Sequence, residues 1–170
     1  MSLKLVIGVI MHEWILWVLV AGSALHVMEE HALGWQGWAT SVMGKKLSVS
    51  FYWQDFYITN AALFIVGIST AMVGWQFVAF GLSFAALNII DAILFHILPS
   101  MRAKRLNPGC ITAIIIYLPV GFLCYWAASK DNVLTVSILV VSIIIGAFLM
   151  ASALVGPKLR NSLGYPDVNK

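Results

Sequence analysis

The chain has 170 residues, of which 61% are hydrophobic and 10% are charged, and its formal net charge is +3. Soluble domains contain about 45–50% apolar and about 25% charged residues, so this composition excludes a disordered chain, a nucleic-acid-binding module and a small disulfide scaffold. It indicates an all-α integral membrane protein, because backbone polar groups find no partners in lipid unless each spanning segment is a helix.

Five apolar stretches of the sequence are long enough to cross a bilayer, because about 20 helical residues span the hydrocarbon core. Glycine, proline and asparagine residues separate them, as is typical of turns between helices. The sequence predicts a polytopic bundle of about five transmembrane helices in one domain, residues 1–155, followed by a polar cytoplasmic tail at 156–170. The predicted helices cover residues 5–28, 56–73, 75–98, 110–128 and 133–155.

Residues 29–55 interrupt this pattern with tryptophan, phenylalanine and tyrosine side chains and two lysines, which is typical of the membrane interface. We expect an interfacial loop or short helix there. With five spans, Lys4 and Lys130 fall on one side of the membrane and the other eight basic residues on the opposite side. The positive-inside rule then predicts a multi-pass protein with its N-terminus outside and its C-terminus in the cytoplasm.

Ionisable side chains inside a membrane span cost about 2.5–3.5 kcal/mol each on insertion scales, so each one is a candidate for function. The first three predicted helices carry such residues together with two asparagines. They are His26, Glu29, Glu30, Asn60, Asn88, Asp91 and His96. Because the first helix ends, the second begins and the third ends on the same predicted side, we expect these residues near one depth. His12 and Glu13, at the other end of the first helix, are expected to be interfacial rim residues.

Helical periodicity places part of this group on one face. At about 100° per residue, Glu29 lies about 60° to one side of His26 and Glu30 about 40° to the other, whereas Asp91 lies about 140° from His96. One imidazole and two carboxylates, completed by an imidazole from a neighbouring helix, are enough ligands for a divalent metal. We therefore predict that His26, Glu29, Glu30 and His96 bind a metal, most suitably zinc, with iron or manganese as alternatives.

The expected chemistry gives each polar residue a role. The predicted catalytic carboxylates are Glu29, Glu30 and Asp91, and we expect Asn60 and Asn88 to orient a ligand or hold a substrate carbonyl. A bound divalent metal lowers the pKa of its water and polarises a substrate oxygen, which favours hydrolysis over redox chemistry.

The stretch His26-Val27-Met28-Glu29-Glu30 resembles the motif of the HXXEE family of small integral-membrane proteins. The family pattern also includes an asparagine and a histidine in a later helix, which Asn88 and His96 match. The segment from Asn107 to Ala113, ahead of an apolar helix with Leu118-Pro119, is similar to that family as well. The resemblance covers residues from about 20 to about 125. It supports the choice of site residues and implies no reaction, because the family has no settled biochemical function.

These observations lead to the hypothesis of a metal-dependent membrane enzyme of hydrolase type, acting on a lipid or another apolar small molecule near the cytoplasmic leaflet. No nucleic-acid partner is expected, and a homodimer would compensate for the small number of helices. Three alternatives stay open: a metal-free acid–base enzyme that isomerises or cyclises a terpenoid-like substrate, a proton-coupled transporter, and a structural accessory subunit. Metal content, turnover in the presence of a chelator and flux in proteoliposomes distinguish them.

Overall fold

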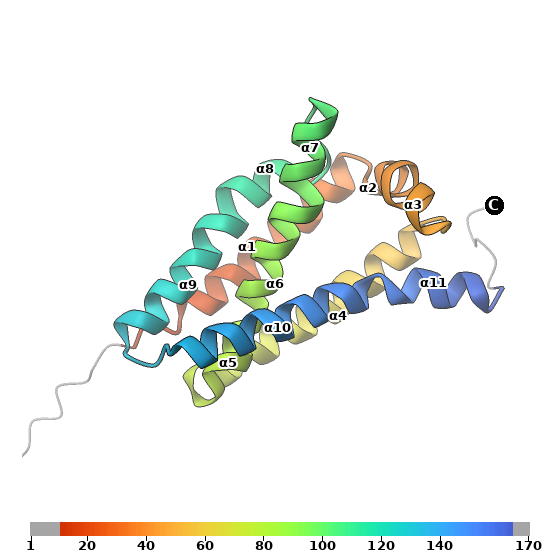
Figure 1. The fold of residues 1–170 in the computed structure, drawn as a ribbon. Helices are drawn as coiled ribbons and strands as arrows, with labels where there is room; N and C mark the ends of the chain where they lie inside the picture. Colours follow the sequence, from red (N-terminus) through yellow and green to blue (C-terminus); the bar gives the residue numbers. More distant parts are fainter. Residues whose placement is uncertain (1–10, 165–170) are drawn as a thin grey trace, which may run out of the picture.

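The computed structural model describes residues 11–164, and all regular structure within this range is helical (Figure 1). The main helices are α1 (Ile15–Ala32), α4 (Trp53–Val73), α6 (Ser83–Asp91), α9 (Leu118–Lys130) and α10 (Val136–Ala153). Shorter α-helices are α2 (Trp35–Ala39), α3 (Lys45–Leu47), α5 (Val78–Gly81), α7 (Leu98–Ala103), α8 (Cys110–Thr112) and α11 (Val155–Ser162). The 3-10 helix η2 (Gly74–Phe77) and the π-helices η1 (Thr40–Gly44), η3 (Ala92–Ile97) and η4 (Ala113–Tyr117) continue or connect them.

Four helical stretches of the described chain are long and apolar enough to cross a membrane: Trp53–Gly81, Ser83–Ala103, Cys110–Lys130 and Val136–Ser162. They confirm the predicted all-α bundle with helices able to span a membrane, although the described residues contain four such stretches where about five were predicted. The first predicted span, residues 5–28, lies partly outside the described residues. Its described part belongs to α1, which continues past the predicted end as far as Ala32.

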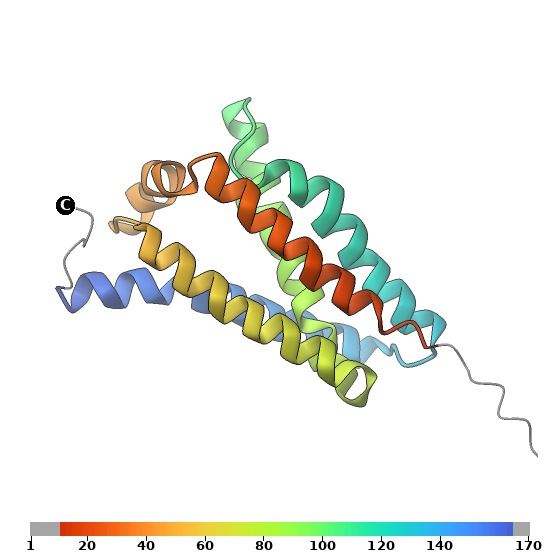
Figure 2. The same ribbon diagram turned by 180° about the vertical axis from the view of Figure 1, so that it is seen from behind.

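Small residues allow close packing around α6, the helix that ends at Asp91. Helices α9 and α10 both pack against α6, and α1 packs against α4 and α9 (Figures 1 and 2). A Cβ added at Gly146 of α10 would lie 2.8 Å from the Ser83 carbonyl oxygen, and one at Gly121 of α9 would lie 2.7 Å from Ile89 Cγ1. Glycines at such contacts let helices approach closely, which is a usual way to hold membrane helices together without a hydrophobic driving force between them.

One end of the bundle is tied together by His12, Glu13, Trp75 and Asp131, which we call the clamp. The Asp131 carboxylate accepts hydrogen bonds from the His12 backbone N–H at 2.6 Å and from Trp75 Nε1 at 2.7 Å, and lies 2.5 Å from His12 Nδ1. Glu13 Oε2 accepts a hydrogen bond from the Trp75 backbone N–H at 3.0 Å. The clamp therefore joins the start of α1 to η2 and to the loop between α9 and α10.

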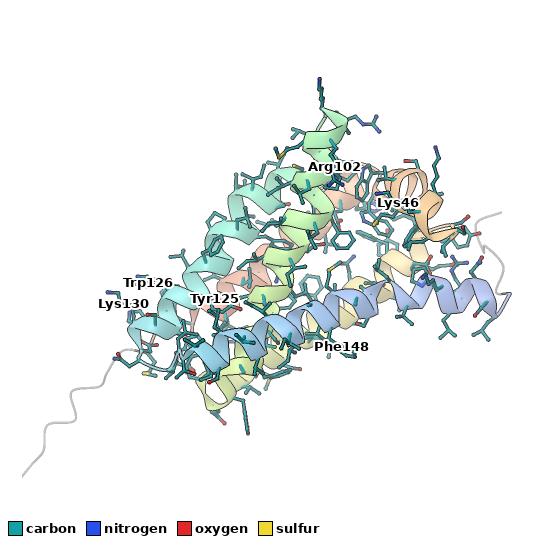
Figure 3. All side chains as sticks on the ribbon, viewed as in Figure 1. Lys46, Arg102, Tyr125, Trp126, Lys130 and Phe148 are labelled. Carbon is teal, nitrogen blue, oxygen red and sulfur yellow. The ribbon has the colours of Figure 1, made fainter. Side chains whose placement is uncertain are left out.

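The opposite end of the bundle carries α2, α3, α7 and α11. Figure 3 shows Lys46 and Arg102 at this end, and Lys130 near the clamp. Helix α11 covers the first part of the predicted polar tail, and its Pro157 falls in the first helical turn, where proline is tolerated. Arg160 of α11 donates two hydrogen bonds to the Asp55 carboxylate, at 2.9 and 3.1 Å, and so ties α11 to the start of α4.

Candidate metal centre

The site begins with two residues on α1 that are four positions apart. His26 and Glu30 are 3% and 6% exposed, and His26 Nε2 lies 3.8 Å from Glu30 Oε1. Residues four apart in an α-helix lie one above the other on the same face. The periodicity of α1 thus places this pair as the sequence predicts.

The second pair comes from the junction of α6 and the π-helix η3. Asp91 is the last residue of α6, and His96 lies within η3. A π-helical turn closes after five residues instead of four, so residues five apart come to lie on one face. Asp91 Oδ2 is accordingly 3.2 Å from His96 Nε2, although α-helical periodicity predicts that the two side chains point apart.

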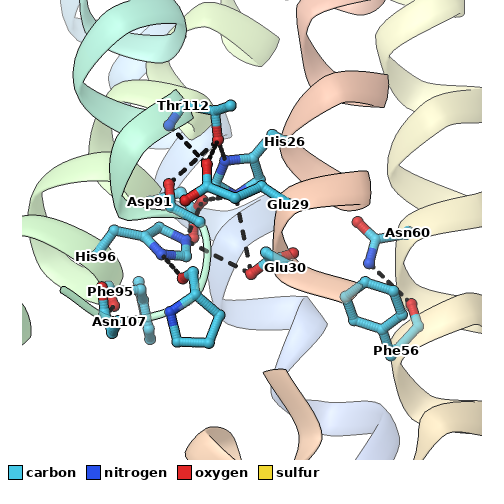
Figure 4. Close-up of polar contacts among 12 residues, drawn as sticks. His26, Glu29, Glu30, Phe56, Asn60, Asp91, Phe95, His96, Asn107 and Thr112 are labelled. Atoms are coloured by element: carbon cyan, nitrogen blue, oxygen red, sulfur yellow. Dashed lines mark hydrogen bonds and ion pairs between the residues drawn. The ribbon is translucent and has the colours of Figure 1, made fainter. Parts of the chain in front are cut away.

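The two pairs face each other and form what we call the four-residue cluster, His26, Glu30, Asp91 and His96 (Figure 4). His26 Nε2 lies 3.7 Å from Asp91 Oδ2, and His96 Nε2 lies 3.7 Å from Glu30 Oε1. For comparison, two ligands of a tetrahedral metal ion with bonds of about 2.0–2.2 Å are about 3.3–3.6 Å apart. One ligand atom from each of His26, Glu30 and His96 lies within 4.8 Å of the other two, so this buried group could hold a metal ion.

Each imidazole is oriented by a hydrogen bond at its other nitrogen. His96 Nδ1 lies 2.8 Å from the Pro108 carbonyl oxygen, which only accepts, so the hydrogen is on Nδ1. His26 Nδ1 lies 2.8 Å from Thr112 Oγ1, whose own hydrogen points to Glu29 Oε2 at 2.5 Å. In both rings the Nε2 atom therefore faces the cluster, and such outer hydrogen bonds are typical of metal-binding histidines.

The structure does not bring Glu29 into the cluster. Its carboxylate accepts hydrogen bonds from the backbone N–H groups of Ile111 and Thr112, at 3.1 and 2.7 Å, and from the Thr112 hydroxyl. Glu29 thus stabilises the start of the helical stretch that begins with α8, where unpaired N–H groups attract a carboxylate. It reaches His26 only through Thr112.

The two asparagines lie on the wall of a cavity beside the cluster. Asn60 Nδ2 donates to the Phe56 carbonyl at 3.0 Å, and Asn88 Nδ2 donates to the Phe84 carbonyl at 2.7 Å. Neither hydrogen-bonds to a side chain of the cluster, although both border the same cavity as His26, Glu30, Asp91 and His96. Figure 4 shows Asn60 separated from the cluster and held by Phe56.

This cavity holds about 860 Å³ of space not filled by atoms, its open mouth included. Its walls come from α1, α4, α6 and the α10–α11 junction, and the α2–α3 segment borders it as well. Eight aromatic side chains contribute to the lining: Trp35, Trp38, Phe51, Phe56, Phe64, Phe84, Phe95 and Tyr117. The four-residue cluster thus lies at the wall of a largely apolar chamber.

Three residues that support the site were not among the sequence candidates: Thr112, Tyr117 and Gly109. The Tyr117 ring stacks on His26, with ring centres 4.2 Å apart. Gly109 has a φ of +83°, and a Cβ there would lie 2.5 Å from His96 Cε1 and 2.7 Å from His26 Cε1. Only a residue without a side chain fits between the two imidazoles. The Asn107-Pro108-Gly109 turn was the available signal, and it indicates a loop without indicating its place at the site.

The comparisons with known proteins bear on the same segment of the chain. A family model described as "Protein of unknown function with HXXEE motif" matches residues 17–124, well over half of the 170 residues. That segment contains the whole four-residue cluster together with Glu29, Gly109 and Thr112. No curated protein and no solved structure matches the chain. The chain therefore belongs to the HXXEE family, the proteins of unknown function that share this motif.

Proposed function

We propose that this protein is a metal-dependent integral-membrane enzyme of hydrolase type that acts on a lipid or another apolar small molecule. The observation that carries the proposal is the convergence of two imidazole Nε2 atoms and two carboxylates at the wall of an apolar cavity. In the clustered pairs, three of the four nitrogen–oxygen separations are 3.7–3.8 Å, too long for hydrogen bonds but suited to ligands around one ion.

In this proposal His26, Glu30 and His96 bind the ion, and zinc is the first choice because it accepts this mixed nitrogen and oxygen set. Such an ion would lower the pKa of a water molecule at the site and would polarise a substrate oxygen. Iron or manganese would accept the same set. Glu29 is not assigned as a ligand, because its carboxylate is engaged with Ile111 and Thr112.

Asp91 is the residue placed to act as the general base. Its Oδ2 atom lies 3.2 Å from His96 Nε2 and 3.7 Å from His26 Nε2, so it borders the position that the ion would take. In hydrolysis the water oxygen bonds to the substrate carbonyl carbon and gives a proton to Asp91. The bond from that carbon to the leaving group breaks, and the proton passes to the leaving group.

The substrate class follows from the surroundings of the cluster. The cavity is lined mainly by aromatic and aliphatic side chains, and the helices around it are long and apolar enough to cross a membrane. A ligand in this chamber keeps its polar reacting group at the cluster and its apolar part among the aromatic rings. The positive-inside rule would place this end of the bundle, which carries Lys46 and Arg102, at the cytoplasmic leaflet.

A metal-free acid–base enzyme is the second candidate, and one contact favours it. The 3.2 Å separation of His96 Nε2 and Asp91 Oδ2 is short enough for these two groups to share a proton. Such a pair can protonate and deprotonate a substrate without a metal, as an isomerase or a cyclase requires. Turnover that survives a strong chelator would favour this candidate.

Elemental analysis of the purified protein tests the proposal. The full chain is purified without chelators, and its metal content is compared with those of His26→Ala, His96→Ala and His31→Ala. His31 is a matched control, because it lies on the same helix, is exposed and contacts Tyr57 outside the cluster. We expect about one zinc ion per chain in the wild type and in His31→Ala, and loss of it in the other two. A wild type without metal, or equal metal in His26→Ala and the wild type, would contradict the proposal.

A further inference from the structure

The polar side chains that border the cavity apart from the four-residue cluster include Ser23 on α1, Asn60 on α4 and Asn88 on α6. We call these three the inner polar set. Each donates one hydrogen bond to the carbonyl oxygen four residues earlier in its own helix, at 2.7–3.0 Å. The Ser23 side chain also pairs with Tyr117 of η4, whereas the two asparagines make no further side-chain hydrogen bond among the described residues.

The direction of the two amides is determined by their partners. Because a carbonyl oxygen only accepts, the nitrogens of Asn60 and Asn88 must face their own helices, which leaves each Oδ1 atom for another partner. No group of the described residues 11–164 donates to either oxygen. Asn88 is 1% exposed and borders the cavity, so its Oδ1 can meet a partner only there. No fully buried side-chain oxygen or nitrogen of the described residues lacks a hydrogen-bond partner, so this unpaired oxygen must be open to the cavity, where a ligand that brings a donor can pair with it.

Two members of the inner polar set lie at a defined depth below the cluster. Ser23 precedes His26 by three residues on α1, and Asn88 precedes Asp91 by three residues on α6. Both helices run towards the cluster in the same direction (Figures 1 and 2). Three residues of an α-helix correspond to about 4.5 Å along its axis. Two walls of the cavity therefore carry polar atoms about one helical turn from the cluster.

The hydrogen-bond donors and acceptors that border the cavity indicate the type of ligand group that binds there. The amide oxygens accept, and Tyr117, which also borders the cavity and stacks on His26, has a hydroxyl that donates and accepts. A hydroxyl group meets both kinds of partner. A ligand carbonyl or ether only accepts, and it leaves the amide oxygens without a donor. The surrounding wall is apolar, with Leu63, Phe64, Leu87 and Met150 among its residues.

We propose that the substrate of this site is a hydroxylated lipid, an apolar molecule whose hydroxyl group lies about one helical turn from its reacting group. The hydroxyl hydrogen is donated to the Asn88 amide oxygen, and the Asn60 amide oxygen is the alternative acceptor on another helix that lines the cavity. The apolar part of the molecule occupies the aromatic portion of the cavity. This inference rests on the proposed function for the identification of the ligand as a substrate, whereas the binding step itself needs no metal.

A pair of matched probes tests the inference. 1-Dodecanol carries a donor and an acceptor, while 1-methoxydodecane keeps the acceptor and lacks the donor. Binding to the full chain in lipid nanodiscs is followed by the fluorescence of the tryptophans, of which Trp35 and Trp38 line the cavity. We expect the alcohol to bind about 2–10-fold more tightly than the ether, which is the effect of one ordinary hydrogen bond. Asn88→Leu, which keeps the side-chain size, should abolish this preference, and Asn60→Leu should reduce it.

The control is Asn161→Leu, because Asn161 lies exposed on α11 and does not border the cavity. This variant should keep the wild-type preference. The same measurements in the His26→Ala background separate the two proposals, since the preference for the alcohol should persist there without metal. A preference combined with a metal-free wild type would reject the metalloenzyme and leave the ligand class standing. Equal binding of both probes, or an unchanged preference in Asn88→Leu and Asn60→Leu, would overturn the inference.

Discussion

Histidine and carboxylate side chains meet at both ends of α1, and the two groups use their polar atoms differently. In the clamp, the Asp131 carboxylate accepts hydrogen bonds from a backbone N–H and an indole N–H and contacts an imidazole at 2.5 Å. In the four-residue cluster, two carboxylates face two imidazole nitrogens at 3.2–3.8 Å. The clamp is a closed hydrogen-bond network, whereas the cluster leaves room for an ion.

This difference separates a structural group from a candidate site made of the same residue types. The clamp contacts join three segments of the chain, and its donors and acceptors are paired with each other. In the cluster the outer nitrogens are paired, with Pro108 and Thr112, while the inner nitrogens face only carboxylates. Polar atoms that are paired with each other, as in the clamp, stabilise the fold. Acceptor atoms that point towards one common position, as in the cluster, favour the binding of a cation. Each prediction below tests one side of this comparison.

The largest effect is expected from Gly109→Ala. The added methyl group would meet both imidazoles, at 2.5 and 2.7 Å, and the backbone at this position has a φ of +83°. Backbone strain and overpacking together should destabilise the protein by about 2–5 kcal/mol. The displaced imidazoles should also lose the metal. Thermal unfolding in detergent and elemental analysis measure the two effects.

Gly34→Ala is the matched control for this variant. Gly34 also has a positive φ, +74°, but nothing lies within 4 Å of an added Cβ. The Gly34→Ala variant should therefore lose stability only through backbone strain, by about 1–2 kcal/mol, and should keep the metal. Equal behaviour of the two variants in both measurements would show that Gly109 is needed for its loop conformation alone, and that the imidazoles do not depend on it.

The sequence was sufficient to predict the features that follow from regular helical geometry. Apolar stretches separated by turn residues indicated the all-α bundle, since a chain in lipid has no other way to pair its backbone. The interval of four residues between His26 and Glu30 placed them on one face, because α1 is a regular α-helix there. The common depth of three helix ends brought His96 to the same region, and the structure places it 3.7 Å from Glu30.

Features that depend on irregular geometry or on distant pairing could not be predicted. The π-helix η3 rotates Asp91 onto the face of His96, and a period of 3.6 residues cannot reveal such a turn. Glu29 finds its partner Thr112 at a separation of 83 residues, so its role as a cap was not evident from its position beside Glu30. For the same reason the contact of His12 with Asp131, 119 residues away, could not be predicted from the position of His12 in the sequence.

A smaller effect is expected on the clamp side, from Asp131→Asn. Burial opposes the ionisation of Asp131, but hydrogen bonds from His12 and Trp75 outweigh it and hold the pKa of this carboxyl below its ordinary value. The ionised group therefore contributes stability above its ordinary pKa of about 4, and this contribution is lost as the pH falls through the lowered value. We expect Asp131→Asn to lower the thermal midpoint at neutral pH by roughly 5 °C.

The variant should also lose part of the acid destabilisation that the wild type shows below about pH 5, where the carboxyl begins to be protonated in the unfolded state. Its metal content should stay at the wild-type level, because the clamp lies at the other end of α1. Loss of metal from Asp131→Asn would mean that the two ends are coupled, and the contrast between them would then fail.

The most local effect is expected from Thr112→Val, which removes one hydroxyl and keeps the side-chain shape. His26 Nδ1 loses its partner at 2.8 Å, so the ring is less firmly oriented while all proposed ligands remain. Loss of such an outer hydrogen bond should weaken metal binding by about 10–100-fold, measured by competition with a chelator of known affinity. Thr112→Ser should restore binding, and Thr135→Val, which alters a helix cap on α10, should leave it unchanged. If Thr112→Val binds the metal as tightly as the wild type, stacking on Tyr117 is sufficient to orient His26, and Glu29 acts only on the helix that starts at α8.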